Sequence, residues 1–288
     1  MILRFQESTA VVTGAARGIG AALALDLAKR GCNLALADVD RYALSQTALA
    51  ARSHQVQVSE HYLDVANAKA AYSFTEDVLR LHARVNLLFN NAGVGLIGTF
   101  EQISLDDFEW LLGINLLGVV RLSKAFLPHL KATPAAQIVN ISSLFGLIAP
   151  AGQTAYCASK FAVRGFSEAL GHELMGSSVG VTCVHPGGVR TAIADRARSA
   201  ESVDARHLAF IREQFVQMAH TAPEEAARSI LHAVERRKRK VLIGTDAVAL
   251  DGLQRLMPVL YYPLLRLLRG KRTELGTTSD RVDSIERR

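Results

Sequence analysis

Short apolar runs alternate along the chain with longer segments that have a helical hydrophobic period. The apolar runs are continuous, which is typical of strands in a parallel sheet that is covered on both faces. The expected strands are residues 8–13, 33–37, 55–62, 85–89, 137–142, 179–184 and 240–243. The expected helices are residues 19–30, 41–51, 66–82, 105–131, 154–174 and 223–236. This order predicts right-handed crossovers and an α/β fold with one doubly wound parallel sheet of about seven strands.

Two segments depart from the alternation. Residues 193–220 insert a mostly helical stretch after the sixth expected strand. Residues 246–269 follow the last strand with an amphipathic, leucine-rich pattern, and the residues after them are expected to fray. We therefore expect one domain over residues 1–250 and a C-terminal amphipathic extension and tail over residues 251–288.

Composition narrows the class of protein. Of the 288 residues, 49% are hydrophobic, which is enough for a large buried core. The 3 cysteines are far apart and odd in number, which favours a reduced, cytoplasmic protein. No stretch reaches the roughly 18 uninterrupted apolar residues that a membrane-spanning helix needs. We expect a soluble protein, and contact with a membrane surface through the C-terminal extension stays open.

The net charge of +6 is concentrated late in the chain, at residues 236–240 and 281–288. The run at 236–240 lies at the end of an expected helix, where the helix dipole favours cations. No aromatic platform accompanies it, so we expect no nucleic-acid partner. The histidines show no metal-like pairing with carboxylates or cysteines, so we expect no metal site.

A glycine-rich turn, TGAARGIG at residues 13–20, follows the first expected strand and opens a helix. Its glycines let the backbone approach a pyrophosphate, and the helix N-terminus offers free N–H groups. Asp38 ends the second strand, where a carboxylate accepts hydrogen bonds from ribose hydroxyls and repels a 2′-phosphate. Arg17 and Arg41 instead favour NADP, because a guanidinium can pair with its 2′-phosphate. We expect NAD as the cofactor, with NADP as the alternative.

The chain resembles the short-chain dehydrogenase/reductase family from residue 9 to about residue 245. The matching motifs are TGxxxGIG at 13–20, LDV at 63–65, NNAG at 90–93, Asn115, ISS at 141–143, YxxxK at 156–160 and PGxVxT at 186–191. The resemblance implies a Rossmann-type fold in which residues 1–250 bind the dinucleotide and perform catalysis. Residues 193–220 would then form a lid over the substrate.

The resemblance also implies which residues bind the cofactor. Asp64 would bond the adenine amino group, residues 90–93 would lie against the adenine ribose, and residues 186–191 would bind the nicotinamide end. The full expected set is Gly14, Arg17, Gly18, Ile19, Gly20, Asp38, Asp64, Val65, Asn91, Ala92, Gly93, Tyr156, Lys160, Pro186, Gly187, Val189 and Thr191.

Tyr156 and Lys160 are four residues apart in an expected helix, so they share a face. A free tyrosine has a pKa of about 10, too high for a base at neutral pH. A nearby ammonium and a cationic nicotinamide favour the phenolate, so we expect the pKa of Tyr156 to be lowered. Tyr156 is the predicted general acid and base, and Lys160 is predicted to lower its pKa and to bind the nicotinamide ribose.

Two further catalytic residues are implied by the resemblance. Ser143 has the spacing of the family's catalytic serine, and its hydroxyl would polarise the substrate carbonyl. Ser142 is the competing candidate, and its spacing is off by one. Asn115 would distort its helix locally and hold a water that leads to Lys160. His185 and Cys157 are expected to be packing residues.

Three segments are expected to line the substrate pocket, residues 94–100, 144–153 and 188–220, and their apolar composition suits an apolar alcohol or ketone. The predicted reaction is the NAD(P)-dependent interconversion of an apolar secondary alcohol and its ketone. The alternatives are an NADPH-dependent 3-oxoacyl thioester reductase and a non-catalytic dinucleotide sensor.

The resemblance implies a homodimer or homotetramer that forms through the helices with Asn115 and Tyr156. Residues 253–269 carry apolar side chains interrupted by three arginines. This segment could pack on a partner subunit, cover the pocket mouth or lie in a lipid interface.

Overall fold

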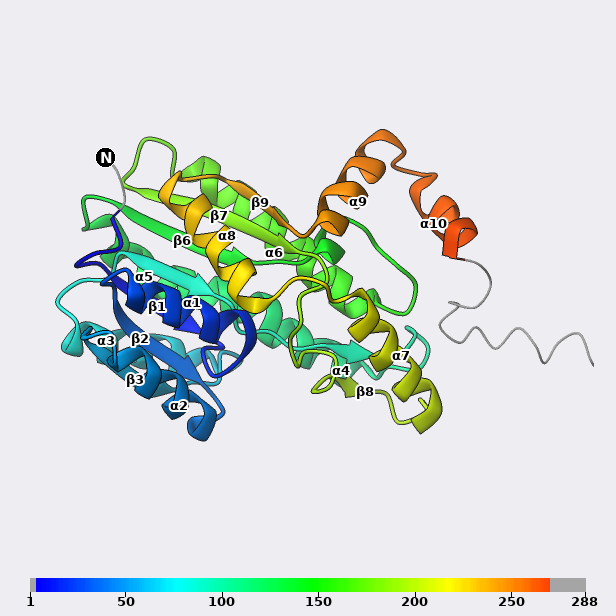
Figure 1. Cartoon of the computed structure of the whole chain (residues 1–288), viewed down its shortest axis with the longest axis horizontal. Coiled ribbons are helices and arrows are strands. Elements are labelled where there is room, and N and C mark those ends of the chain that lie inside the picture. The colour runs from blue at the N-terminus through cyan, green and yellow to red at the C-terminus, as the bar shows by residue number, and fades with distance from the viewer. Residues whose placement is uncertain (1–3, 270–288) are drawn as a thin grey trace, which may run out of the picture.

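Seven parallel strands form the central sheet of the computed structural model, which describes residues 4–269 (Figure 1). Their order across the sheet is β3-β2-β1-β4-β6-β7-β9. The strands are β1 (Thr9–Thr13), β2 (Asn33–Asp38), β3 (Val58–Tyr62), β4 (Leu87–Asn90), β6 (Ala136–Ile141), β7 (Val179–Pro186) and β9 (Lys240–Ile243). From β1 the chain adds strands in one direction to β3, and then in the other direction from β4 to β9. The predicted doubly wound sheet is therefore confirmed.

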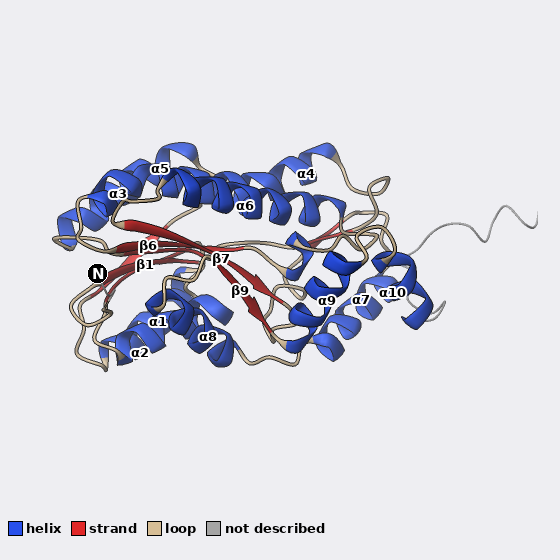
Figure 2. Cartoon of the chain, turned by 90° about the horizontal axis from the view of Figure 1, so that it is seen from above, coloured by secondary structure: helices blue, strands red, loops and turns tan. Residues whose placement is uncertain are grey.

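Helices cover both faces of this sheet (Figure 2). One face carries α1 (Gly18–Lys29), α2 (Arg41–Arg52) and α8 (Pro223–Glu235). The other face carries α3 (Ala68–Leu81), α5 (Gly118–Lys131) and α6 (Thr154–Glu173), with α4 (Leu105–Leu112) at the end of the same layer. Parallel strands require such crossover connections, because a tight turn can join only antiparallel neighbours.

An apolar cluster lies on each face of the sheet. Side chains along a strand alternate between the two faces. Val12 of β1 therefore packs in the cluster that includes Leu27 of α1 and Ile230 of α8. Its neighbour Val11 packs in the opposite cluster, which includes Phe126 of α5. Burial on both faces is the physical reason for the continuous apolar strand sequences.

The expected start of the third strand at residue 55 is wrong. Gln55 has φ 62, a left-handed conformation that belongs to the turn after α2. In this turn the N–H of Gln55 donates to the carbonyl of Arg52 at 3.0 Å. The strand therefore begins at Val58, three residues later than expected.

The fourth expected helix, residues 105–131, contains a wider turn. Between α4 and α5 the five residues of η1 (Gly113–Leu117) form a π-helical turn, which includes Asn115. Such turns distort a helix locally and are frequent at functional sites. The same stretch, Leu105–Lys131, is the one segment among the described residues with the length and hydropathy to cross a membrane. Leu122 and Phe126 bury its α5 part in the core of the fold.

The insert at 193–220 forms a separate layer beyond the sheet. Its strand β8 (Arg198–Ser199) pairs in parallel with β5 (Leu96–Ile97), and its helix is α7 (Ala205–Met218). Among the described residues of α7, no side chain is fully buried. The helix is therefore held to the rest of the fold by partial contacts.

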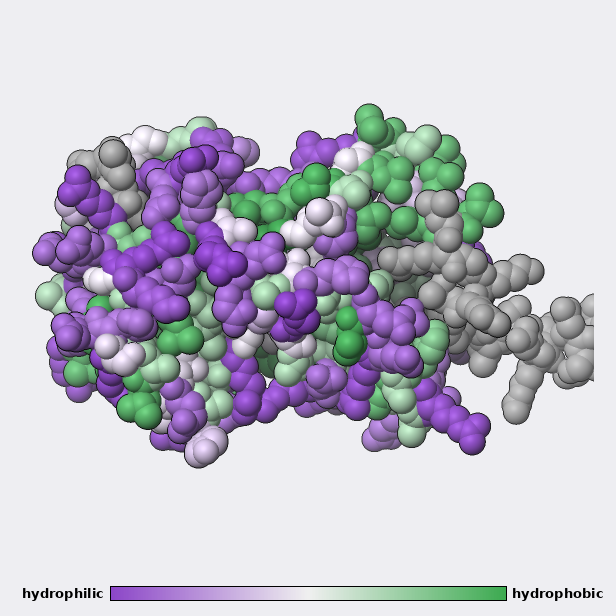
Figure 3. All heavy atoms as spheres, in the orientation of Figure 1, coloured by the Kyte–Doolittle hydropathy of each residue, from purple (hydrophilic) through white to green (hydrophobic). Residues whose placement is uncertain are grey.

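The C-terminal extension consists of α9 (Thr245–Leu256) and α10 (Tyr261–Arg269). The expected boundary at residue 250 falls inside α9, which packs on the body through the buried Ala247. Apolar side chains of this region gather on the surface at the upper right of Figure 3. The most exposed are Leu256, Val259 and Leu267. The tail expected to fray, residues 270–288, lies outside the described residues.

Candidate active site

A cavity of about 1510 Å³ opens at the carboxyl ends of the central strands. Ligands of open α/β sheets bind at this edge, where the strand order reverses. A pocket for one drug-sized ligand has roughly 300–1,000 Å³, so this cavity has room for a dinucleotide and a second molecule. All of the predicted site residues line it except Gly20 and Asn115, which act from behind its wall.

The glycine-rich turn between β1 and α1 leaves no space for side chains. Gly14 has φ 64, and a Cβ atom on Gly20 would lie 2.0 Å from the carbonyl oxygen of Gly14. Within the described chain no side chain caps the N-terminus of α1. Its first N–H groups therefore face the cavity as an anion site, which fits a pyrophosphate.

Asn91 holds this turn against the end of β4. Its Nδ2 donates to the carbonyl oxygens of Thr13 at 2.9 Å and of Gly14 at 3.1 Å. The Thr13 hydroxyl accepts the backbone N–H groups of Asn91 and Ala92, both at 3.1 Å. The two residues thus brace the cofactor turn, and the contribution of Thr13 was missed in the sequence.

The part of the cavity expected to hold the adenosine lies at the end of β2. Both oxygens of Asp38 accept backbone N–H groups, from Ala16 and Asp40, each at 3.0 Å. Arg17 forms an ion pair with Asp40 at 2.6 Å. The guanidinium of Arg41 lies 4.6 Å from the centre of the Tyr62 ring. Sequence analysis identified both arginines as possible phosphate ligands and missed Asp40, which pairs with the first.

The loops after β3 and β7 complete the cofactor wall. The carboxylate of Asp64 accepts the N–H of Ala66 at 2.9 Å, and the neighbouring Val65 is buried. In the loop expected to bind the nicotinamide, the N–H of Gly188 donates to the carboxylate of Asp246 at 2.7 Å. Asp246 comes from α9 and was not expected in the site. Thr191 packs over the glycine-rich turn. A Cβ atom on Gly18 would lie only 3.0 Å from the Cγ2 atom of Thr191.

Tyr156 and Lys160 on α6 meet Ser143 from the end of β6. Lys160 donates from Nζ to the carbonyl of Ile141 at 2.9 Å, and Nζ lies 5.6 Å from the centre of the Tyr156 ring. The Ser143 side chain faces the cavity, and its Oγ accepts the N–H of Phe145 at 3.1 Å. The Ser142 hydroxyl instead donates to the backbone carbonyl of Lys160 at 2.8 Å. This arrangement favours Ser143 over Ser142 as the residue that contacts substrate.

Asn115 connects three elements from its buried place in η1. Its Oδ1 accepts the N–H of Val94 at 2.8 Å, and its Nδ2 donates to the carbonyl of the same residue at 3.0 Å. The Nδ2 also donates to the Ser159 hydroxyl on α6 at 3.3 Å. The wide turn thus fixes the loop after β4 relative to the helix that carries Tyr156.

The expected direction of the Tyr156 pKa shift is wrong for the protein alone. Burial raises the pKa of Tyr156 to about 12, and the nearby Ser143 hydroxyl opposes this only in part. Burial also lowers the pKa of Lys160 to about 8, because the ammonium loses its water. Sequence reasoning counted the charge of Lys160 and omitted the desolvation of both groups, which is the larger effect.

His185 lies directly behind Ser143 in the core. Its Nδ1 is 3.0 Å from the backbone carbonyl oxygen of Ser143, and the side chain is fully buried. Burial lowers the pKa of His185 to about 4, so the ring is neutral at physiological pH. A neutral ring donates from Nδ1 to this carbonyl, and His185 positions the serine, a role beyond the simple packing expected.

The apolar half of the cavity has more walls than the three expected segments. These segments contribute side chains such as Leu96, Phe145 and Phe215, and α10 adds Tyr261, Tyr262 and Leu265. The Tyr261 hydroxyl accepts the N–H of Ala149 at 3.0 Å, and that of Tyr262 accepts the N–H of Ala151 at 3.4 Å. The sequence left three roles open for residues 253–269: packing on a partner subunit, covering the pocket mouth or contact with lipid. In the structure, α10 lies at the pocket.

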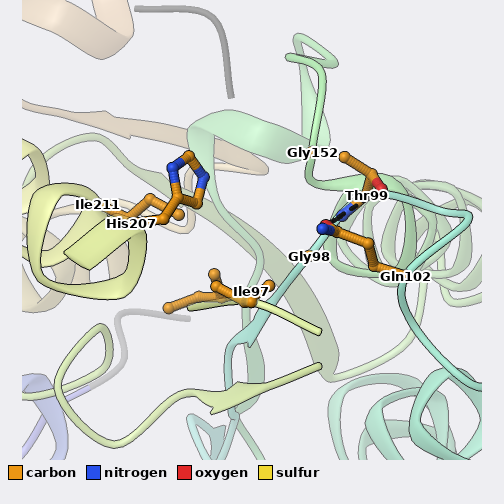
Figure 4. Close-up of a pocket in the computed structure, with 8 residues that line it drawn as sticks. Ile97, Gly98, Thr99, Gln102, Gly152, His207 and Ile211 are labelled. Carbon is orange, nitrogen blue, oxygen red and sulfur yellow. Dashed lines mark hydrogen bonds between the residues drawn. The ribbon is translucent and has the colours of Figure 1, made fainter. Parts of the chain in front are cut away.

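A second, much smaller cavity lies beside the lid, between α7 and β5 (Figure 4). His207 and Ile211 of α7 lie opposite Gly98 and Thr99, and its volume is about 10 Å³. That is room for about one water molecule. It therefore adds nothing to the substrate site.

Known proteins share this architecture. The model of the short chain dehydrogenase family matches residues 8–202. A Mycobacterium tuberculosis protein named as an oxidoreductase, SadH, is 42% identical over 263 residues, which cover 91% of this chain and 95% of that protein. A short-chain dehydrogenase/reductase from Burkholderia phymatum, solved in complex with NAD, has a TM-score of 0.84 and 32% identity over 91% of this chain and 97% of that chain.

A further solved structure is an alcohol dehydrogenase from the archaeon Thermococcus sibiricus, complexed with 5-hydroxy-NADP. It has a TM-score of 0.71 and 26% identity, covering 82% of this chain and 95% of that chain. The fold and the site together define an NAD(P)-dependent oxidoreductase. The chain belongs to the short-chain dehydrogenase family.

Proposed function

We propose that this protein interconverts an apolar secondary alcohol and its ketone, with NAD as the preferred dinucleotide. One observation carries the proposal. Ser143, Tyr156 and Lys160 line the same cavity as the glycine-rich turn and the apolar side chains of α7 and α10. A bound nicotinamide would accept a hydride from the alcohol carbon or supply one to the ketone carbon.

The protein's own groups handle the proton. The Tyr156 hydroxyl gives a proton to the carbonyl oxygen during reduction, and its phenolate takes one from the alcohol during oxidation. The Ser143 hydroxyl donates a hydrogen bond to the same oxygen and stabilises its developing charge. The ammonium of Lys160 favours the phenolate, which offsets part of the effect of burial.

The residues at the cavity wall fit a dinucleotide. The N-terminus of α1 would hold the pyrophosphate, and the Asp38 carboxylate would accept the adenosine ribose hydroxyls. Asp64 and Val65 would hold the adenine. Lys160 would bind the other ribose, and the turn from Pro186 to Thr191 would hold the nicotinamide.

The cavity wall supports an apolar substrate. Four of the five residues that α7 contributes are apolar, Phe210, Ile211, Phe215 and Met218, and the fifth is Gln214. The alcohol dehydrogenase among the solved neighbours is consistent with an alcohol substrate. Formation of a homodimer or homotetramer, a cytoplasmic location and peripheral membrane contact stay predictions.

The direct test is a turnover screen of apolar secondary alcohols and ketones with NAD(H) and NADP(H), followed by the change in dinucleotide absorbance. We expect turnover to rise with the apolar area of the substrate. Turnover of 3-oxoacyl thioesters alone would support the reductase alternative. Dinucleotide binding without turnover of any carbonyl or alcohol would support a sensor.

A further inference from the structure

One carboxylate at the adenosine end of the cavity engages two arginines. Oδ2 of Asp40 is 2.6 Å from the guanidinium of Arg17 and 3.5 Å from that of Arg196. Oδ1 of the same residue accepts the N–H of Ala43 and caps α2. Arg17 comes from the glycine-rich turn, whereas Arg196 comes from the insert that forms the lid. The ion pairs therefore join the lid to the cofactor-binding edge.

All three side chains line the same cavity as Asp38. Asp38 is the carboxylate expected to accept the ribose hydroxyls, and its two oxygens already accept backbone N–H groups. Its position is thus set by the main chain. Asp40 differs from Asp38 in its partners, because its Oδ2 atom contacts the guanidiniums of Arg17 and Arg196.

Two guanidiniums that converge on one point form a typical site for a phosphate, since each offers a fork of N–H donors. Without Asp40, the adenosine end would present this pair to a 2′-phosphate. The Arg17 guanidinium beside Asp40 holds the pKa of that carboxyl below its usual range, so it is ionised at neutral pH. The carboxylate competes with a 2′-phosphate for both arginines and also repels it.

We propose that Asp40 strengthens the dinucleotide preference expected from Asp38 by engaging Arg17 and Arg196, and that Arg196 makes the insert at 193–220 part of the cofactor site. The inference rests on the proposed binding of NAD(H) or NADP(H) in this cavity, and not on the identity of the substrate. Its test therefore measures dinucleotide affinity directly.

The test begins with Asp40→Asn. Asparagine caps a helix about as well as aspartate, so α2 keeps its N-terminal hydrogen bond while the charge is removed. We expect the dissociation constant for NADPH to fall about ten-fold, the effect of about one charge-assisted hydrogen bond. The dissociation constant for NADH should change by less than about three-fold, because NADH has no 2′-phosphate. Fluorescence titration at constant ionic strength measures both.

A second substitution, added to Asp40→Asn, shows which arginines bind the 2′-phosphate. Asp40→Asn combined with either Arg17→Gln or Arg196→Gln should lose most of the gain in NADPH affinity. Asp40→Asn combined with Arg198→Gln is the matched control, because Arg198 lies in the same lid and pairs with Asp107 and Trp110 instead. This double variant should keep the gain. Arg196→Gln alone, at an exposed position, should weaken NADPH binding and leave NADH binding unchanged even if Asp40→Asn folds poorly.

The inference would be overturned if Asp40→Asn left the ratio of NADPH affinity to NADH affinity unchanged. It would also be overturned if adding Arg198→Gln removed the gain in NADPH affinity as fully as adding Arg17→Gln or Arg196→Gln. A wild-type protein that binds NADPH more tightly than NADH would overturn it as well. In these cases turnover of apolar alcohols would still support the proposed function. A wild-type protein that binds neither dinucleotide would overturn both.

Discussion

At the scale of single residues, burial decides the state of the catalytic groups before any ligand is considered. The phenol of Tyr156 and the ammonium of Lys160 both lie deep in the site, and each is shifted toward its neutral form. A phenol with a pKa near 12 is a proton donor at neutral pH and a poor base. Efficient oxidation of an alcohol therefore requires added positive charge near the ring, which a cationic nicotinamide would provide.

Replacing Tyr156 with phenylalanine tests the proton transfer. The ring and its packing remain, whereas the group that exchanges the proton is lost. We expect turnover to fall by about 10²- to 10⁴-fold, the usual contribution of general acid–base catalysis, with dinucleotide affinity changed by less than about three-fold. Steady-state kinetics and fluorescence titration measure these quantities. The control is Tyr42→Phe at an exposed position on α2, and full activity of Tyr156→Phe would refute the assigned role.

His185 makes a different prediction, for stability against pH. Its pKa is lowered from 6.5 to about 4, mainly by burial. The hydrogen bond with the Ser143 carbonyl opposes this, as does Asp251, whereas the charges of Lys240 and Arg164 lower the pKa further. Between these pKa values the unfolded chain binds the proton more tightly. The folded state therefore loses stability as the pH falls from about 6.5 toward about 4.

From about pH 7.5 to about pH 5, this residue should cost the folded protein about 2 kcal/mol. Urea unfolding at both pH values, for wild type and His185→Gln, isolates the effect because all other histidines are shared. Between these two pH values, the free energy of unfolding should fall by about 2 kcal/mol less in His185→Gln than in wild type. Parallel curves for the two proteins would mean that His185 is protonated in the folded state.

At the scale of elements, the catalytic helix α6 is held in place by pieces that are distant in sequence. The π-helical turn η1 places Asn115 where it bonds Val94 and Ser159 at once. The C-terminal helix α10 closes the apolar half of the cavity through Tyr261 and Tyr262. The insert at 193–220 joins the N-terminus of α2 through the ion pair of Arg196 with Asp40, and joins α4 through that of Arg198 with Asp107.

Two leucines on α10 test whether this helix shapes the substrate pocket. Leu265 lines the cavity, whereas Leu267, two residues on, is 79% exposed. Leu265→Ala removes apolar contact area, so KM for bulky apolar substrates should rise about ten-fold or more. Leu267→Ala should leave KM unchanged. Equal effects of the two substitutions would indicate that α10 acts only through the stability of the fold.

At the scale of the whole molecule, the fold buries every cysteine. Cys32, Cys157 and Cys183 are free and buried, and burial raises their pKa values to about 12, 12 and 11. The thiolate is the reactive form, so these thiols should be inert in the folded protein. A chromogenic disulfide reagent at about pH 8 should react with none of them in buffer and with all three in denaturant. Rapid reaction of one thiol in buffer would show that a helix layer opens.

Much of this molecule was predictable from local sequence. Continuous apolar runs identified the strands because a strand covered on both faces has no polar side. The glycine-rich turn identified the cofactor edge because only glycine fits the close contact between Gly14 and Gly20. The motif residues were therefore found by spacing, and all but Gly20, Asn90 and Asn115 line the cavity.

Other features depend on residues that no spacing rule connects. Asp40 meets Arg196, and Ser143 meets His185, only after the sheet and the lid have assembled. The place of α10 stayed open in the sequence because an amphipathic helix can pack on a subunit, on a membrane or over a pocket.

By itself, the sequence determined the order of the elements and the set of side chains available for chemistry, because hydrophobic period and turn geometry are local properties. Tertiary structure alone decided the protonation tendencies of Tyr156 and Lys160, the partners of Arg17 and the walls of the substrate pocket. These depend on desolvation and on distances between side chains, and both arise only when remote segments pack together.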